Sequence, residues 1–86
     1  MPHDLEVTPG MYQHYKGGTY RVLFVATEST NAREGNKAVV YISLKDGLVY
    51  YRDLKEFTEL VEWPDGGRKP RFIGAYTSFK NPVRKQ

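Results

Sequence analysis

Apolar and polar residues alternate along several short runs of the chain, and glycine-containing turns separate these runs. Alternation with a period of two is typical of β-strands that bury one face in a core. The pattern predicts strands near residues 11–15, 19–27, 38–44, 48–52 and 58–63. A short closing strand near residues 71–73 follows the last turn. We therefore predict an all-β protein.

Two turns set the predicted registers. Gly17-Gly18 supplies the positive φ angles of a two-residue hairpin turn, and Asp46-Gly47 is among the strongest short hairpin signals. Two-residue turns would place Tyr12 opposite Leu23 and Ile42 opposite Tyr51. The predicted core face then holds Met11, Tyr15, Tyr20, Val22, Phe24, Ala26, Val40, Ile42, Leu44, Val49 and Tyr51. The predicted outer face holds Tyr12, His14, Arg21, Leu23, Val25, Val39, Tyr41, Ser43, Lys45, Tyr50 and Arg52.

A single helical turn is predicted at residues 54–57. Asp53 is a plausible N-cap for it, and Glu56 stands where a capping box places an acidic residue. Pro64-Asp65-Gly66-Gly67 forms a further turn. These elements predict a small five-stranded SH3-like barrel with one short helical turn. The alternative is a strongly bent, open antiparallel sheet with one face covered by the terminal arms.

Length and charge divide the chain into three parts. A chain of 86 residues is one domain, with a loose arm at residues 1–9, a β domain at 10–73 and a basic tail at 74–86. Lys and Arg number seven against nine Asp and Glu in residues 1–63 (7 − 9 = −2), but six against one in residues 64–86 (6 − 1 = +5). The basic segment from Arg68 to Lys85 is therefore either a polyanion contact or a solubilising end.

Several classes of protein are disfavoured by what the chain lacks. It has no cysteine and only two histidines, which is too few for an ordinary zinc site, and no run approaches the length of a membrane span. No nucleophile motif surrounds Ser29, Ser43 or Ser78, and the glycine pairs lack the lysine of a phosphate loop. We expect a cytoplasmic binding protein without a cofactor, a metal or catalytic residues.

The outer face suggests a binding role. Aromatic platforms flanked by cations hold single-stranded nucleic acid in small barrels. The predicted nucleic-acid-binding residues are Tyr41, Tyr50, Arg52, Arg68, Lys69 and Arg71, with further contacts from Tyr12, His14 and Arg21. Two alternatives stay open. The same tyrosines with Trp63 and Arg52 form a hot-spot patch for a protein partner, or the hairpins enclose a small nucleotide.

One series of motifs resembles a known family. The motifs are G-x-Y-x-H-Y-K-G-G-x-Y-x-V at Gly10 to Val22, V-V-Y from Val39, the Asp46-Gly47 pair, Arg52, Phe57 and R-F at Arg71. Together they resemble domain-of-unknown-function family 1653, whose members are small bacterial and phage β domains. The resemblance implies a short stand-alone β domain and no established activity, cofactor or site residue. Residues 73–86 extend past the usual end of this family.

Overall fold

The computed structural model describes residues 7–74 of the chain, so most of the predicted arm and tail lie outside the described residues. The described part of the chain has seven strands: β1 (Gly10–His14), β2 (Thr19–Thr27), β3 (Lys37–Ser43), β4 (Val49–Asp53), β5 (Leu60–Glu62), β6 (Arg68–Pro70) and β7 (Phe72–Gly74). A 3₁₀ turn spans Asn31–Arg33, and helix α1 spans Leu54–Phe57, the bounds that the sequence predicts. Within residues 7–74, no helix is long and apolar enough to cross a membrane.

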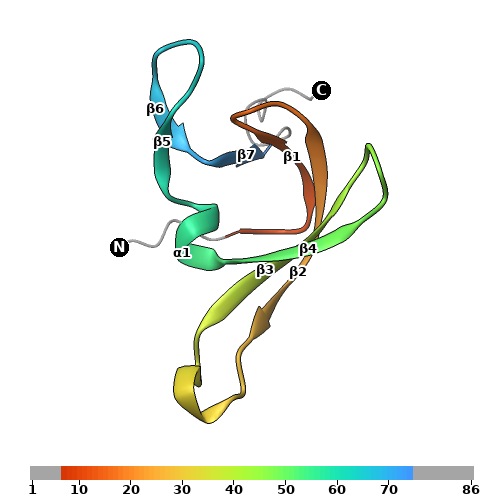
Figure 1. Ribbon diagram of the computed structural model, residues 1–86, viewed down its shortest axis with the longest axis vertical. Coiled ribbons are helices and arrows are strands. Elements are labelled where there is room, and N and C mark those ends of the chain that lie inside the picture. Colours follow the sequence, from red (N-terminus) through yellow and green to blue (C-terminus); the bar gives the residue numbers. More distant parts are fainter. Residues whose placement is uncertain (1–6, 75–86) are drawn as a thin grey trace, which may run out of the picture.

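The strands form two antiparallel sheets. The larger has the order β4-β3-β2-β1-β7, and β5 and β6 form a separate hairpin. Figure 1 shows the large sheet bending around a space that α1 and the β5–β6 hairpin border from the other side. Along the described chain, β4 and β7 do not pair with each other, so the large sheet is open rather than a closed barrel. The all-β class with one short helix is confirmed.

The first hairpin turn is longer than predicted. His14 N–H donates to the Gly18 carbonyl at 3.1 Å, which encloses a three-residue loop that ends at Gly17, with φ 103°. This is a common hairpin loop in which glycine takes the left-handed position. Tyr12 therefore faces Tyr20, three positions from its predicted partner. Because side chains alternate with a period of two, this odd shift exchanges the faces of β1 relative to β2.

The second hairpin also differs in its turn. Ser43 N–H donates to the Leu48 carbonyl at 2.9 Å, so four residues rather than two form the loop. Ile42 faces Val49 instead of Tyr51, a shift of two positions. Because the shift is even, the residues of β3 and β4 that were predicted to share a face still share one. The structure, however, buries the set that was predicted to lie on the outer face. The side chain of Tyr51 is 79% exposed.

A β-bulge at Leu23 corrects a further prediction. Val22 pairs with Tyr41, and Phe24 pairs with the next residue, Val40, so Leu23 is an extra residue in β2. The bulge inverts the alternation along β2, and Phe24 points to the outer face with 54% exposure. Four residues predicted in the core are exposed: Phe24, Leu44, Val49 and Tyr51.

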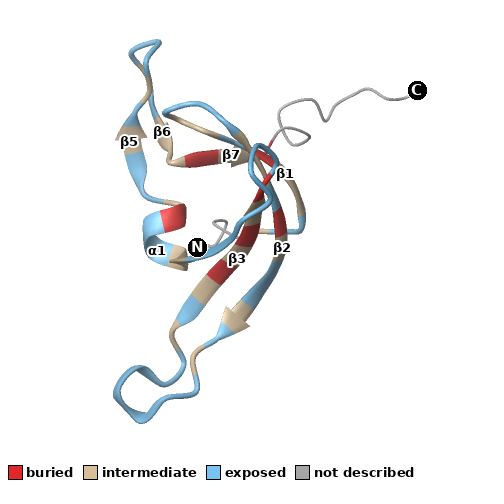
Figure 2. Cartoon of the chain, turned by 45° about the vertical axis from the view of Figure 1, so that its right-hand side comes forward, coloured by how far each residue is buried: buried red, intermediate tan, exposed pale blue. Residues whose placement is uncertain are grey.

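The observed core is aromatic and lies on the concave side of the sheet. Its buried apolar residues are Tyr12, Val22, Val39, Tyr41, Phe57 and Phe72. The Phe57 and Phe72 rings stack with centroids 4.1 Å apart and planes within 1° of parallel. Figure 2 shows that buried segments of the strands face α1, which brings Phe57 across from the sheet. Helix α1 and β7 thus decide which face of the sheet is inside.

Candidate functional site

A row of aromatic rings crosses the concave side of the sheet. Its members, in spatial order, are Trp63, Tyr15, His14, Tyr20, Tyr41 and Tyr50, and successive ring centroids are 6.4, 4.9, 6.0, 5.5 and 5.9 Å apart. The last four belong to the consecutive strands β1, β2, β3 and β4. All except Tyr41 are at least partly exposed. We call this set the aromatic row.

Three cations stand over rings of this row, and a fourth stands over the core ring of Phe72 beside it. Lys16 Nζ and Arg71 Cζ lie 5.7 and 5.8 Å from the centroid of the Tyr15 ring. Arg52 Cζ lies 5.8 Å from the Phe72 ring, and Lys69 Nζ lies 5.2 Å from the Trp63 ring. These distances are within the range of cation–π attraction. We call Lys16, Arg52, Lys69 and Arg71 the row cations.

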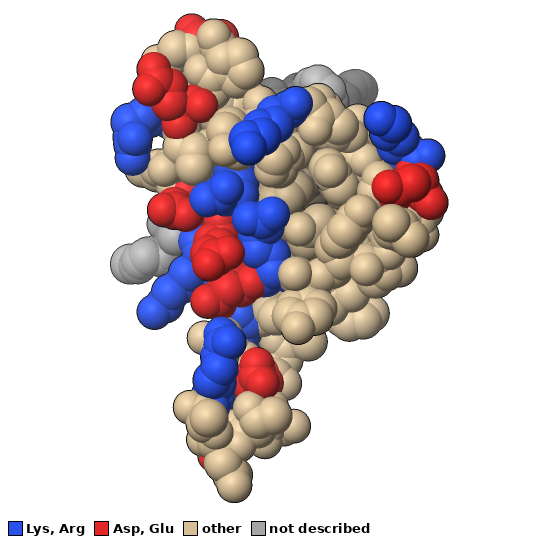
Figure 3. Space-filling model, in the orientation of Figure 1, with Lys and Arg blue, Asp and Glu red and all other residues tan. Residues whose placement is uncertain are grey.

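Three row cations have acidic partners. Arg71 and Glu59 approach to 2.7 Å, Lys69 and Asp65 to 2.9 Å, and Arg52 and Glu56 to 4.0 Å. Figure 3 shows the resulting column of mixed charges over α1, β5 and β6, beside a largely uncharged area. All three carboxylates are more exposed than buried, and exposed ion pairs contribute little stability. An anionic ligand can therefore compete with these carboxylates for the cations.

Arg71 is the most firmly held of the row cations. Its Nε donates to the Glu56 carbonyl at 2.9 Å, and its backbone N–H donates to the Glu59 carbonyl at 2.8 Å. Its own carbonyl accepts the Tyr15 N–H at 3.1 Å. Arg71 thus joins the end of β1 to α1 and β5, and fixes the position of Tyr15 in the row.

The structure brings most of the predicted binding residues together. Tyr50 and Arg52 lie on one face of β4, and Arg52 Nε donates to the Tyr41 hydroxyl at 3.3 Å. Tyr41 itself is 4% exposed, so the prediction that it is an open stacking platform is wrong. Arg68 lies apart on the β5–β6 hairpin, where its guanidinium donates to the Leu60 carbonyl at 3.4 Å.

The predicted outer-face contacts separate. Tyr12 is buried in the core, and His14 lies with it on the concave side. Arg21 faces Met11 and so points to the opposite side of the sheet. The odd register shift of the first hairpin causes this separation. Tyr20 packs against the core, as the sequence predicts, and its partly buried ring also belongs to the aromatic row. Tyr15, which the sequence places in the core with it, lies in the loop after β1 and belongs to the row as well.

His14 is the titratable group at the centre of the row. Partial burial lowers its pKa below the ordinary value of 6.5, and the positive charges of Arg52, Arg71 and Lys16 lower it further. Its Nδ1 accepts the Lys16 backbone N–H at 3.2 Å, which leaves Nε2 to carry the proton of the neutral ring. His14 is therefore neutral at pH 7 and adds a flat ring rather than a charge.

We expect Arg52→Gln to raise the pKa of His14, because the substitution removes a nearby positive charge. The matched Arg21→Gln variant should leave this pKa unchanged, since Arg21 points to the opposite face. NMR titration of the His14 ring signals measures both. Equal shifts of the His14 pKa in both variants would contradict the assigned neighbours.

The lowered pKa of His14 also makes the stability of the fold depend on pH. The unfolded chain binds the proton at higher pH than the folded one, so the stability from neutral His14 is full above about pH 6.5 and falls as the pH drops.

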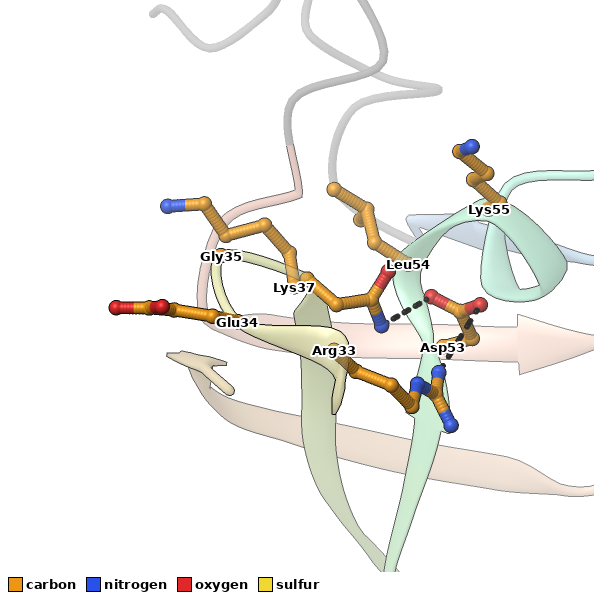
Figure 4. A pocket seen from close by; sticks show the side chains of 8 residues that line it. Arg33, Glu34, Gly35, Lys37, Asp53, Leu54 and Lys55 are labelled. Carbon is orange, nitrogen blue, oxygen red and sulfur yellow. Dashed lines mark hydrogen bonds and ion pairs between the residues drawn. The ribbon is translucent and has the colours of Figure 1, made fainter. Parts of the chain in front are cut away.

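Apart from the aromatic row, a pocket lies between the β2–β3 loop and the start of α1. This pocket of about 520 Å³ includes Arg33, Asn36 and Asp53 in its lining. Asn36 Nδ2 donates to the Asp53 carboxylate at 3.1 Å, and Arg33 approaches this carboxylate to 3.9 Å. Figure 4 shows the Arg33 side chain extending toward Asp53. Asp53 is the N-cap residue of α1, as the sequence predicts, but its carboxylate makes no capping hydrogen bond. Asn36 and Arg33 already hold this carboxylate, so the aromatic row is the better candidate.

Comparisons with known proteins agree with the sequence motifs. The profile of a family described as "Protein of unknown function (DUF1653)" matches residues 10–73. The chain belongs to the DUF1653 family. A crystal structure of a DUF1653 protein from Bordetella bronchiseptica is 30% identical, covers 94% of this chain and 96% of that chain, and superimposes with a TM-score of 0.65. No curated protein matches the chain. The DUF1653 match includes every residue of the aromatic row and all four row cations.

No group of three or more His, Cys, Asp or Glu side chains in residues 7–74 is placed to hold a metal ion. Nothing in the arrangement of the row provides a nucleophile beside a base. What the row offers chemically is a set of ring faces and edges next to cations. This combination suits a ligand that has both flat apolar groups and negative charge.

Proposed function

We propose that this DUF1653 protein binds single-stranded nucleic acid along the aromatic row. The observation that carries the proposal is the continuity of the row, whose rings reach from Trp63 to Tyr50, with cations over the Trp63 and Tyr15 rings. Unpaired bases stack on such rings, and the phosphates contact the cations. A duplex hides its base faces, and the row offers no helix or ribbon to enter a groove.

The charge of the row sets the expected salt dependence. Each phosphate contact in a single strand adds about −0.7 to the log–log salt slope, so four row cations give a slope no steeper than about −3. Lys80, Arg84 and Lys85 of the tail lie outside the described residues and can add at most about −2. Deleting residues 75–86 should therefore flatten the slope without removing the stacking contacts.

Two neighbouring tyrosines of β4 provide the test. Tyr50 lies on the concave side with 40% exposure, whereas Tyr51 lies on the outer face. We expect Tyr50→Ala to weaken binding by about 1 to 3 kcal/mol, because a stacking ring is lost. Tyr51→Ala should change the affinity by less than about 0.5 kcal/mol, as ordinary surface substitutions do. Anisotropy of labelled DNA and RNA oligonucleotides at low salt measures both variants.

Trp63 gives an independent signal, because it is the single tryptophan of the chain and lies in the row. Binding along the row should quench its fluorescence. Absence of binding at low salt to both DNA and RNA would refute the proposal. So would a loss of affinity that is larger for Tyr51→Ala than for Tyr50→Ala.

A protein-binding role is the second candidate, and the observation that favours it is the apolar outer face. Phe24, Val49 and Tyr51 are exposed there on β2 and β4. Aromatic hot spots release no counterions, so binding that persists in high salt would favour this role over nucleic acid.

We also propose that the fold is an open relative of the SH3-like barrel. Support comes from the last strand, β7, which follows α1 and pairs with the first strand, β1. Pairing of first and last strands is what brings the two ends of a small barrel together.

A further inference from the structure

The outer edge of β4 has free backbone groups. Ser43 N–H donates to the Leu48 carbonyl, and Leu44 N–H donates to the Thr19 carbonyl, so odd-numbered residues of β3 bond toward β4 and even-numbered ones toward β2. The alternation of an antiparallel ladder then directs the backbone of Tyr50 and Arg52 toward β3.

The same alternation directs the backbone of Val49 and Tyr51 away from β3. Asp53 presents its N–H there, while its carbonyl belongs to the first turn of α1 as the N-cap residue. Within residues 7–74, β4 has β3 as its single strand neighbour. The edge of the large sheet is therefore available for a further strand.

This edge lacks two of the usual protections, a proline and a bulge, although β4 is short and carries the charged Arg52 and Asp53. Natural sheets shield their edges with proline, bulges, or a covering helix or loop. The register of β3 and β4 has no bulge, and residues 49–53 include no proline. A hollow of about 520 Å³ is lined by residues that include the consecutive Tyr50, Tyr51, Arg52 and Asp53. Because consecutive side chains point to opposite faces, a hollow that touches all four must run along the edge.

We propose that the β4 edge pairs with the β4 edge of a second copy of this chain. The product is a two-fold symmetric dimer with a continuous sheet across both copies, and the axis passes beside Tyr51. Tyr51 of each copy exchanges both backbone hydrogen bonds with Tyr51 of the other. Each Asp53 N–H donates to the Val49 carbonyl of the second copy.

The side chains select this register. In this register, Tyr50 of each copy lies opposite Arg52 of the other copy. Both pairs occupy non-hydrogen-bonded positions of the ladder, where opposing side chains are closest. A ring and a guanidinium attract each other in this arrangement. A shift of two residues in one direction would set Arg52 against Arg52, and like charges directly opposite are unfavourable. A shift in the other direction would place Asp53 beyond the end of the second strand.

The occupant is a second copy because the match is reciprocal. A symmetric contact requires one patch that complements itself, and β4 carries both members of the Tyr50–Arg52 pair. On the other face, the exposed Tyr51 rings meet at the axis. An unrelated peptide would gain the backbone bonds but not this reciprocal pairing. Since each aromatic row ends at Tyr50, the dimer would also join two rows into one surface.

Amide hydrogen exchange of the full chain, followed by NMR at low and high protein concentration, tests the pairing. Tyr50 and Arg52 amides should exchange slowly at both concentrations, since they bond to β3. Tyr51 and Asp53 amides should become protected at the higher concentration alone, when sedimentation shows a dimer. Small interfaces of this kind are weak, so the range should extend to high protein concentration.

Two variants sharpen the test. Tyr51→Pro removes an N–H that points away from β3, a position where an edge strand tolerates proline, and should give a monomer with an unchanged β spectrum. Tyr51→Cys should form a disulfide-linked dimer on mild oxidation, because Cα atoms of a hydrogen-bonded pair lie about 5.5 Å apart. Phe24→Cys, on the same face but on β2, should cross-link far more slowly. The natural chain has no cysteine to interfere.

A monomer at every accessible concentration would overturn the proposal. A dimer without protection of Tyr51 and Asp53 would also overturn it, and would assign the contact to another surface. Protection that is independent of concentration would assign the edge to a segment of the same chain. If Tyr51→Pro fails to fold, exchange and cross-linking still decide.

Discussion

Replacing Val39 by aspartate is expected to unfold the domain. Val39 is fully buried, at 0% exposure, in the interior strand β3. Arg52 stands opposite Val39 on β4, but its guanidinium already donates to the Tyr41 hydroxyl, and taking a carboxylate out of water into a buried site costs several kcal/mol. A single core of this size seldom supplies more than about 3 to 5 kcal/mol. Circular dichroism and urea titration of the variant should show loss of the β signal or a strongly lowered midpoint.

The neighbouring valine is the matched control. Val40→Asp makes the same chemical change one position along β3, on the outer face, where water reaches the carboxylate. We expect it to cost about 1 kcal/mol. If Val40→Asp unfolds the protein while Val39→Asp melts close to the parent, the concave and outer faces are exchanged and the aromatic row is no longer a surface.

The sequence predicts the positions of the strands along the chain more accurately than it predicts which face of each strand is buried. Alternation and turn residues are local, and the observed bounds of β2 and α1 agree with the prediction. In β3, however, both faces are rich in apolar groups. Val40 and Ile42 make the more hydrophobic set, yet the structure buries Val39 and Tyr41. The choice depends on Phe57 and Phe72, which arrive from later elements.

Turn length is the second limit on the prediction. The Gly17-Gly18 pair suits a two-residue turn, but a three-residue loop that ends in glycine has nearly the same local sequence. The two options differ by an odd shift, which decides whether Tyr15 or Tyr12 is buried. The bulge at Leu23 leaves no sign in the alternation, because hydrophobic residues stand on both sides of it.

Part of the predicted binding site is present in the structure despite these errors in register. Tyr50 and Arg52 stay on one face because the second hairpin shifted by an even number of positions. The pKa of His14 is lowered mainly by burial and next by Arg52, which reaches it across the sheet. No local pattern shows that residues from β1 and β4 meet across the sheet, since those contacts follow from the fold.

Phe57→Ala is the second substitution with a large expected effect. Phe57 is 1% exposed, stacks on Phe72, and meets the rings of Tyr12 and Tyr41 with centroids 5.7 and 5.5 Å away. Truncation of a buried phenylalanine costs about 3 to 5 kcal/mol. Helix α1 has one turn and cannot persist without tertiary packing, so its contacts should be lost together with the ring.

Phe24→Ala separates the observed core from the one that the sequence predicts. Because Phe24 points outward, its truncation is expected to lower the free energy of unfolding by about 1 kcal/mol. If Phe24 lay in the core, the loss of stability would equal that of Phe57→Ala. Urea unfolding of both variants, fitted with a common slope, gives the comparison. A large loss at Phe24 with a small one at Phe57 would mean that β2 has no bulge and that its alternation runs unbroken from Val22. The pairing of β2 with β3 beyond Leu23 would then be wrong, because it is the bulge that sets Val25 rather than Phe24 on the concave face, opposite the buried Val39.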